Sequence, residues 1–303
     1  MNENKKINFE IKSHNIDDVE GKYDVRNKLN DLTGKEWLKL TRSFWFSETS
    51  KIDKSSFKHP APFMVADISK LIKLFTKKNM LILDPFVGSG TTLIASLLEF
   101  RNCIGIDLNE QYKNIFLDRY NEVFTNLDKL IYKKINFEYK IGDSNLKLNE
   151  IENLSIDYIV TSPPYHNILK NNGSGLRKIS KNGYRSGSRV GVEYYSNDEN
   201  DLGNLDSYSE FLYKFKEIMK KSYEKLKFNK YCSIIISDFT VNKREISVHS
   251  DIIKVMLDIG FEFSGTIVLL QDKKPLYPFG YPYQYKINHH HQNIINFRKN
   301  LKI

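Results

Sequence analysis

The stretch Asp84-Pro85-Phe86-Val87-Gly88-Ser89-Gly90-Thr91-Thr92 lies between an apolar run at residues 80–83 and an apolar-periodic segment at residues 93–100. Glycines between a strand and a helix let a ligand approach the backbone, and the first helix amides can receive a polar or anionic group. The stretch lacks the Gly-Lys-Ser/Thr ending of a phosphate loop and the glycine spacing of a dinucleotide fingerprint. It predicts a strand, a tight turn and a helix that form a ligand site, with an ordinary tight turn as the plain alternative.

Strands and helices alternate along the rest of the chain. Apolar spacing predicts helices at residues 66–75, 109–126, 207–226 and 247–259, and strands at 103–106, 137–141, 156–160, 232–237, 263–270 and 293–297. Counted from the apolar run at residues 80–83, the first four strands end in polar or acidic residues. The pattern predicts an α/β, Rossmann-like, largely parallel and doubly wound sheet with helices on both faces and ligands at the carboxyl ends of the strands. Residues 1–56 are expected to form an N-terminal arm that lies against a main domain of residues 57–303.

Composition narrows the class of protein. The 303 residues include 40% hydrophobic residues, which is enough for a buried core, and carry a formal net charge of +9. The positive excess favours a polyanionic partner, although lysines can also simply solvate a surface. No apolar run approaches the roughly 18 residues of a membrane span, and the polar start favours a cytoplasmic protein without membrane contact.

Cysteine and histidine positions argue against metal and disulfide chemistry. Cys103 and Cys232 each lie inside an apolar run, where a thiol usually behaves as a small hydrophobe. His289, His290 and His291 are adjacent, and adjacent residues entering a strand point to opposite faces. We therefore expect no metal site and no disulfide.

Carboxylates follow three successive strands. Asp84 ends the first, Asp107 ends the second and Asp143 follows the third. An acid at the second position can accept hydrogen bonds from ribose hydroxyls. Three acids at one edge suit a ligand with an amino group, a ribose and an adenine amino group, a description that fits S-adenosylmethionine.

The fourth strand ends at Thr161-Ser162-Pro163-Pro164-Tyr165. Two prolines fix the backbone and remove two donors, which leaves preceding carbonyls free to accept. Ser162 adds a hydroxyl acceptor, and Tyr165 offers a flat face on which a base can stack. The plain alternative is that Pro-Pro-Tyr only ends the strand.

Together these motifs resemble those of the amino-methylating DNA methyltransferases, which act on N4 of cytosine or N6 of adenine and have the class I methyltransferase fold. Asp84 to Thr92 is similar to their cofactor motif, in the form that is common in the beta class. His59-Pro60-Ala61-Pro62-Phe63 is similar to the segment that closes over the methionine end of the cofactor. The resemblance covers about residues 57–165, but here the cofactor motif precedes the catalytic motif, so the beta-class order is permuted.

The resemblance implies a set of site residues. Cofactor binding is assigned to His59, Pro60, Phe63, Asp84, Phe86, Gly88, Gly90, Thr91, Thr92, Asp107 and Asp143, and catalysis to Ser162, Pro163, Pro164 and Tyr165. The target amino group would donate to Ser162 Oγ and to a carbonyl near Pro163, while Tyr165 stacks on a base that has left the duplex.

Two further segments are candidates for contact with DNA. An insert at about residues 166–206 has no acid between Tyr165 and Val192, and its basic residues are Lys170, Arg177, Lys178, Lys181, Arg185 and Arg189. These cations can contact phosphates and bases, or form a solvated surface loop. The aromatic segment from Pro275 to Tyr285 can line the base pocket or the DNA cleft, or pack into the core.

The first residue of the catalytic motif, Ser162, indicates which base is methylated. In the resembled family serine is usual in cytosine enzymes, whereas Asp or Asn more often marks adenine enzymes, so Ser162 favours cytosine N4. The alternatives are adenine N6 and, more distantly, RNA or protein-glutamine methylation or a catalytically inactive DNA-binding module. Expected partners are double-stranded DNA and, for a restriction-modification system, a cognate restriction endonuclease.

Overall fold

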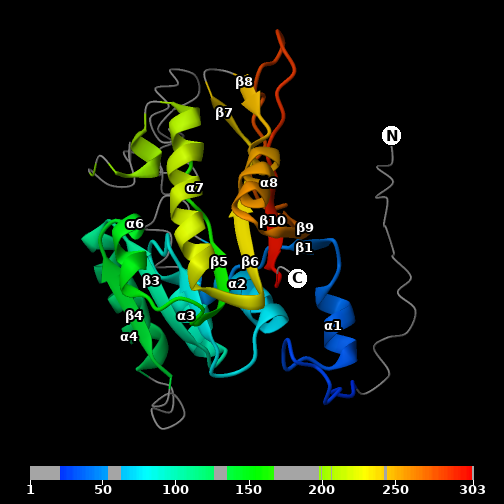
Figure 1. Cartoon of the computed structure of the whole chain (residues 1–303). Coiled ribbons are helices and arrows are strands. Elements are labelled where there is room, and N and C mark those ends of the chain that lie inside the picture. The colour runs from blue at the N-terminus through cyan, green and yellow to red at the C-terminus, as the bar shows by residue number, and fades with distance from the viewer. Residues whose placement is uncertain are drawn as a thin grey trace, which may run out of the picture.

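The computed structural model describes residues 21–53, 63–125, 135–166, 198, 200–205, 207–241 and 244–301 (Figure 1). Its first elements are α1 (Gly34–Leu40), β1 (Phe44–Phe46) and the 3-10 helix η1 (Lys51–Asp53). A capping box between Thr33 and Glu36 starts α1. Asn30 Nδ2 donates to the Leu74 carbonyl at 2.6 Å. This N-terminal segment is therefore anchored to the main body.

The next part of the chain alternates strands and helices. Its elements are α2 (Val65–Phe75), β2 (Leu81–Asp84), α3 (Thr91–Leu98), β3 (Asn102–Asp107), α4 (Glu110–Phe124), β4 (Phe137–Ile141), α6 (Ser144–Lys147), η3 (Leu148–Glu150) and β5 (Ile156–Thr161). Asn109 caps α4, since its side chain accepts from the Gln111 amide at 2.9 Å.

The last part completes the sheet. Its elements are η4 (Leu202–Asn204), α7 (Tyr208–Lys225), β6 (Leu226–Ile236), β7 (Phe239–Val241), β8 (Arg244–Ile246), α8 (Val248–Ile259), β9 (Glu262–Leu270) and β10 (His291–Lys299). β6 begins well before the predicted residue 232, because its first half is partly exposed and polar and so lacks an apolar run.

In the described residues the main sheet has eight strands in the order β1-β9-β10-β6-β5-β2-β3-β4. All pairings are parallel except those of β10, which is antiparallel to β6 and β9. One buried cluster packs α2 and α3 on one face, with Ile68, Leu71 and Leu93 fully buried. A second cluster packs α7 and α8 on the other face, with Phe211, Phe215 and Ile252 fully buried. The predicted doubly wound α/β sheet is confirmed.

The structure adds strands that the sequence reasoning did not predict. β1 pairs with β9 in parallel, and the Trp45 side chain lies in the core. β7 and β8 form a separate antiparallel pair. Cys103 and Cys232 are both free thiols, and both are buried, as their positions inside apolar runs predict. No helix among the described residues is long and apolar enough to cross a membrane.

The segment from Gln271 to His290 joins β9 to β10 and projects from the body beside β7 and β8 (Figure 1). Most of its side chains are exposed, including Tyr281, Tyr283 and Tyr285. The alternative that these aromatic residues pack into the core is therefore wrong.

Candidate active site

A pocket opens at the carboxyl ends of β2, β3 and β5. It encloses about 870 Å³, including its opening to solvent. Its walls come from the loop after β2, the ends of β3 and β5, the start of α6 and the segment before η4. Neighbouring parallel strands end at one edge of a sheet, which brings residues far apart in sequence to one place.

The loop from Phe86 to Gly90, between β2 and α3, is termed the glycine loop. Hydrogen bonds to neighbouring strands hold it in place. The Val87 amide donates to the Ile106 carbonyl at 3.0 Å, and the Tyr139 hydroxyl donates to the Gly88 carbonyl at 2.8 Å. Gly90 has φ +79° at the start of α3, and a Cβ at this position would overlap the Phe116 ring. Gly90 thus meets a packing requirement.

Arg119 of α4 supports the same loop from the protein interior. Its fully buried side chain donates from Nη1 to the Ser89 carbonyl at 2.7 Å and to Thr91 Oγ1 at 3.0 Å. Burial lowers the pKa of Arg119 to about 10, while the charge of Asp53 opposes this shift. The sequence reasoning did not identify this residue.

Asp84 joins three segments at the floor of the pocket. Its carboxylate accepts from Thr92 Oγ1 at 2.5 Å, from Thr161 Oγ1 at 2.5 Å and from the Phe86 amide at 3.0 Å. Burial raises the pKa of Asp84 to about 6. Asp84 therefore organises the site, in addition to lining it.

Asp107 lies beside the glycine loop. Its two oxygens accept from the Gly88 amide and the Asn109 amide, each at 2.9 Å, and each oxygen retains a lone pair for a ligand. Burial raises the pKa of Asp107 to about 7, and the nearby charges of Asp201 and Asp84 add to this effect.

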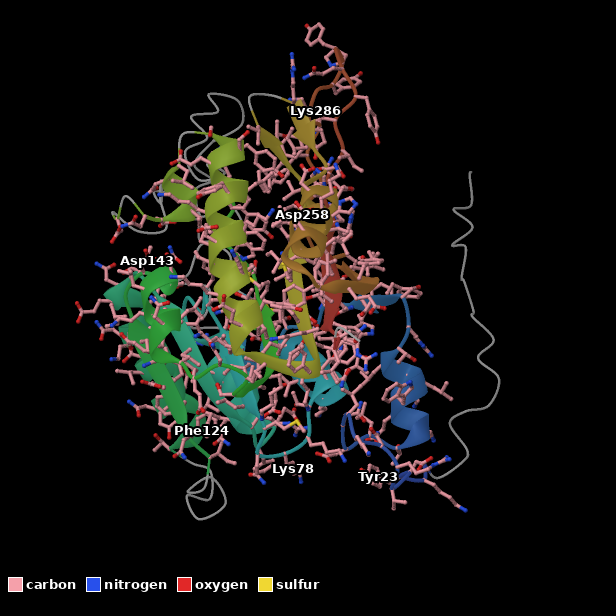
Figure 2. The ribbon with its side chains drawn as sticks, viewed as in Figure 1. Tyr23, Lys78, Phe124, Asp143, Asp258 and Lys286 are labelled. Carbon is pink, nitrogen blue, oxygen red and sulfur yellow. The ribbon has the colours of Figure 1, made fainter. Side chains whose placement is uncertain are left out.

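Two more acids complete the lining. Asp143 lies between β4 and α6 and accepts from the Asn145 amide at 2.8 Å (Figure 2). Asp201, from the segment that precedes η4, is buried and accepts from the Gly203 amide at 2.9 Å. The sequence reasoning missed Asp201, because nothing in its local pattern places it beside residues almost a hundred positions earlier.

Ser162, Pro163, Pro164 and Tyr165 line the pocket directly after β5. Ser162 is half-buried, whereas Tyr165 is buried. The Tyr165 hydroxyl accepts from Gln292 Nε2 at 2.9 Å and from the Ser237 amide at 3.3 Å. Its ring meets that of Phe239 edge to face, with centroids 5.7 Å apart. The tyrosine orientation is thereby set by β10, by β7 and by the residue that directly follows β6.

The pocket brings together most of the predicted site residues. These are Phe63, Asp84, Phe86, Gly88, Thr91, Thr92, Asp107, Asp143, Ser162, Pro163, Pro164 and Tyr165. Gly90 is not among the lining residues. His59, Pro60, Lys170, Arg177, Lys178, Lys181, Arg185 and Arg189 lie outside the described residues.

The described lining contains four aspartates and no lysine or arginine. Such a pocket attracts a ligand that carries positive charge or several hydrogen-bond donors. Among the residues that the structure describes, no group of three or more His, Cys, Asp or Glu side chains can hold a metal ion.

Comparison with known proteins supports a family resemblance. A family model described as DNA methylase (N6_N4_Mtase) matches residues 1–118, which include the glycine loop but end before Ser162. Type II methyltransferase M.BglI of Bacillus subtilis is 30% identical over 124 residues, covering 41% of this chain and 35% of that protein. Type II methyltransferase M2.MboI of Moraxella bovis is 36% identical over 115 residues, covering 37% of this chain and 40% of that protein. The resemblance to amino-methylating DNA methyltransferases is confirmed.

These matches span less than half the length of either curated relative. Among solved structures, TrmN from Thermus thermophilus aligns with a TM-score of 0.48 at 11% identity, over 82% of this chain and 52% of that chain.

Proposed function

We propose that this chain is an S-adenosylmethionine-dependent DNA methyltransferase that modifies the exocyclic N4 of cytosine in a restriction-modification system. Adenine N6 is the alternative acceptor. The observation that carries the proposal is the position of Ser162 to Tyr165 on the wall of a pocket whose floor is the glycine loop and whose lining is acidic. One pocket thus offers both a place for a cationic cofactor and acceptors for an amino group.

The residues present fit S-adenosylmethionine. Asp107 and Asp143 offer carboxylate oxygens to hydroxyl and amino donors, and the four lining aspartates favour the positive charges of the cofactor. Phe63 and Phe86 add apolar surface to the same lining. When bound, the cofactor supplies an electrophilic methyl group.

The chain's own contribution is to position the target amino group. Ser162 Oγ and a carbonyl beside Pro163 would accept hydrogen bonds from its two N–H groups, which favours a pyramidal and more nucleophilic nitrogen. Because hydrogen bonds from Gln292 and the Ser237 amide hold the Tyr165 hydroxyl, the ring is fixed before a base arrives. Catalysis would then rest on alignment and oriented dipoles.

The choice of cytosine N4 rests on Ser162. Its hydroxyl is a neutral acceptor, and the resembled family most often has serine here in cytosine enzymes. The insert between Tyr165 and η4 is proposed to contact duplex DNA through its six basic residues, since it joins the catalytic motif to Asp201.

The test is methylation in vitro with labelled cofactor and mixed-sequence duplex DNA, followed by enzymatic digestion and mass spectrometry of the nucleosides. N4-methylcytosine is the expected product. N6-methyladenine would move the assignment to the alternative acceptor. Cofactor binding without transfer to DNA or RNA would indicate a catalytically inactive DNA-binding module instead.

A further inference from the structure

The projecting segment from Gln271 to His290, termed the tyrosine loop below, displays aromatic side chains to solvent. Tyr281, Tyr283 and Tyr285 are 81%, 93% and 89% exposed. Leu276 and Phe279 on the same loop are also exposed. Large aromatic side chains grouped on one exposed element mark a surface that meets a partner.

The tyrosine loop has a defined internal structure. At its neck, Asn288 accepts from the Tyr277 amide at 3.0 Å and donates to the Tyr277 carbonyl at 2.9 Å. Nearer the tip, the amides of Tyr283 and Gln284 both donate to the Gly280 carbonyl at 2.8 Å. Gly280 has φ +77°, and a Cβ there would overlap the Gln284 carbonyl. The tyrosines are thus presented on a preformed scaffold, which reduces the entropy lost on binding.

The base of the loop adjoins the candidate catalytic motif. The Gln271 amide donates to the His290 carbonyl at 2.7 Å. Two residues further on, Gln292 Nε2 donates to the Tyr165 hydroxyl at 2.9 Å. The loop therefore leaves the sheet at the same edge as the pocket, on the side of β9 and β10.

The charge of the loop points to a polyanion. Lys273, Lys274 and Lys286 are exposed, and Asp272 is the one acid between Gln271 and His290. Figure 2 shows Lys286 on the projecting loop, beyond the body of the sheet. Cations interleaved with aromatic rings form the combination that binds nucleic acid, through phosphates and through stacking on bases.

We propose that the tyrosine loop binds the DNA duplex beside the target base, with tyrosine rings packed against bases or sugars and lysines against phosphates. The position beside a target base rests on the proposed function, because a base enters the pocket only in that case, whereas the duplex contact rests on the tyrosines and lysines of the loop itself. A narrow projection with lysines and tyrosine hydroxyls fits a groove better than it fits the flat apolar interface of a second copy.

The test compares matched tyrosine variants in the full chain. Tyr283→Ala and the triple variant Tyr281→Ala/Tyr283→Ala/Tyr285→Ala remove side chains from the loop. Tyr213→Ala removes a tyrosine that is 64% exposed on α7. Affinity for a fluorescently labelled mixed-sequence duplex is measured by anisotropy, cofactor affinity by calorimetry and oligomeric state by light scattering.

The triple variant should bind the duplex about tenfold more weakly or worse, since one base–aromatic stack alone is worth roughly that factor. Tyr213→Ala should match the wild type, and all variants should keep their cofactor affinity. Unchanged duplex affinity in the triple variant would overturn the assignment. So would a wild type that is dimeric while the triple variant is monomeric, because the tyrosines would then form a dimer interface.

Methyl transfer by the wild type separates this assignment from the proposed function. A wild type that binds DNA through the loop but methylates no nucleic acid would leave the loop assignment standing and overturn the proposed function. A wild type that methylates DNA while the triple variant binds the duplex equally well would do the reverse.

Discussion

The Thr161 hydroxyl donates a 2.5 Å hydrogen bond to Asp84 Oδ1. This bond joins the end of β5 to the end of β2, across 77 positions of sequence. Ser162 follows Thr161 directly, and the glycine loop follows Asp84. This buried contact, together with the parallel pairing of β2 with β5, therefore links the candidate catalytic motif to the candidate cofactor loop.

Thr161→Val keeps the shape of the side chain but removes this donor. Asp84 then keeps Thr92 and the Phe86 amide as its partners. Loss of one partner of a buried carboxylate costs about 1–3 kcal/mol, so the free energy of unfolding in urea should fall by that amount. Thr161→Ser retains the hydroxyl and should stay close to the wild type. Equal free energies of unfolding for the wild type and both variants would show that the contact does not stabilise the fold.

Arg119→Met should weaken cofactor binding, although Arg119 does not line the pocket. The change leaves the Ser89 carbonyl without its 2.7 Å donor and so loosens the glycine loop. Arg101→Met is the matched control, because Arg101 is also buried but donates to the Thr76 carbonyl at the other edge of the sheet. Both variants should lose about 1–3 kcal/mol of unfolding free energy.

Calorimetric titration with S-adenosylmethionine separates the two arginines. Affinity should fall several-fold in Arg119→Met and stay unchanged in Arg101→Met. Arg119→Lys can still donate to the Ser89 carbonyl and should recover part of the loss. An equal fall in affinity in both methionine variants would indicate a general loss of stability and not a role in positioning the loop.

Cofactor affinity should rise with pH between about 6 and 7. Burial raises the pKa of Asp107 to about 7 and that of Asp84 to about 6, from 3.8. A cationic ligand favours the ionised carboxylates, so binding below pH 7 should release protons. Calorimetry in buffers of different ionisation enthalpy measures this release. Asp107→Asn should reduce it, and pH-independent binding by the wild type would contradict the electrostatic role of these acids.

The ligand-free protein should show the opposite trend in stability. Because the folded carboxyls hold their protons to a higher pH than the unfolded ones, their contribution is greatest below the unfolded value of 3.8. It declines as the pH rises through about 6 and 7. Urea unfolding across this range measures how the free energy of unfolding changes with pH. The stabilisation added by the cofactor should increase with pH, as the affinity does.

The ends of β2, β3 and β5 could be predicted from sequence, because each buried strand is an apolar run that stops at a polar residue. Arg119 and Asp201 could not, since their roles depend on contacts between distant segments. The three-residue strand β1 is too short for a period, and its pairing with β9 is tertiary. The start of α1 could have been predicted from sequence, because Thr33 and Glu36 have capping-box spacing.

Ser162→Ala should suppress methyl transfer by roughly 10²-fold, on the scale seen when one aligned hydrogen-bonding group is removed from an active site. Cofactor affinity should stay near that of the wild type, because the acids and the glycine loop are untouched. Ser155→Ala is the matched control, since Ser155 directly precedes the opposite end of β5. Parallel loss of transfer and of cofactor affinity in Ser162→Ala would remove Ser162 from its proposed role.

Tyr165→Phe separates the ring from the hydroxyl. The phenyl ring can still stack on a base, but Gln292 Nε2 loses its 2.9 Å acceptor. Transfer should fall less than in Tyr165→Ala, which removes the stacking face as well. Single-turnover methylation of duplex DNA measures both effects, and identical losses would assign the whole contribution to the hydroxyl.

Neutralising Lys170, Lys178 and Lys181 with glutamine should reduce the salt dependence of DNA binding. Each phosphate contact adds roughly 0.9 to the slope of log affinity against log salt, so three contacts should lower it by about 2.7. The control changes Lys22, Lys28 and Lys78, which are exposed; Lys78 precedes β2, at the end of that strand opposite the pocket. The control removes the same charge from the chain, and its slope should match that of the wild type. A slope unchanged in the insert variant would exclude the insert from the DNA interface, and equal reductions in both variants would attribute the effect to net charge alone.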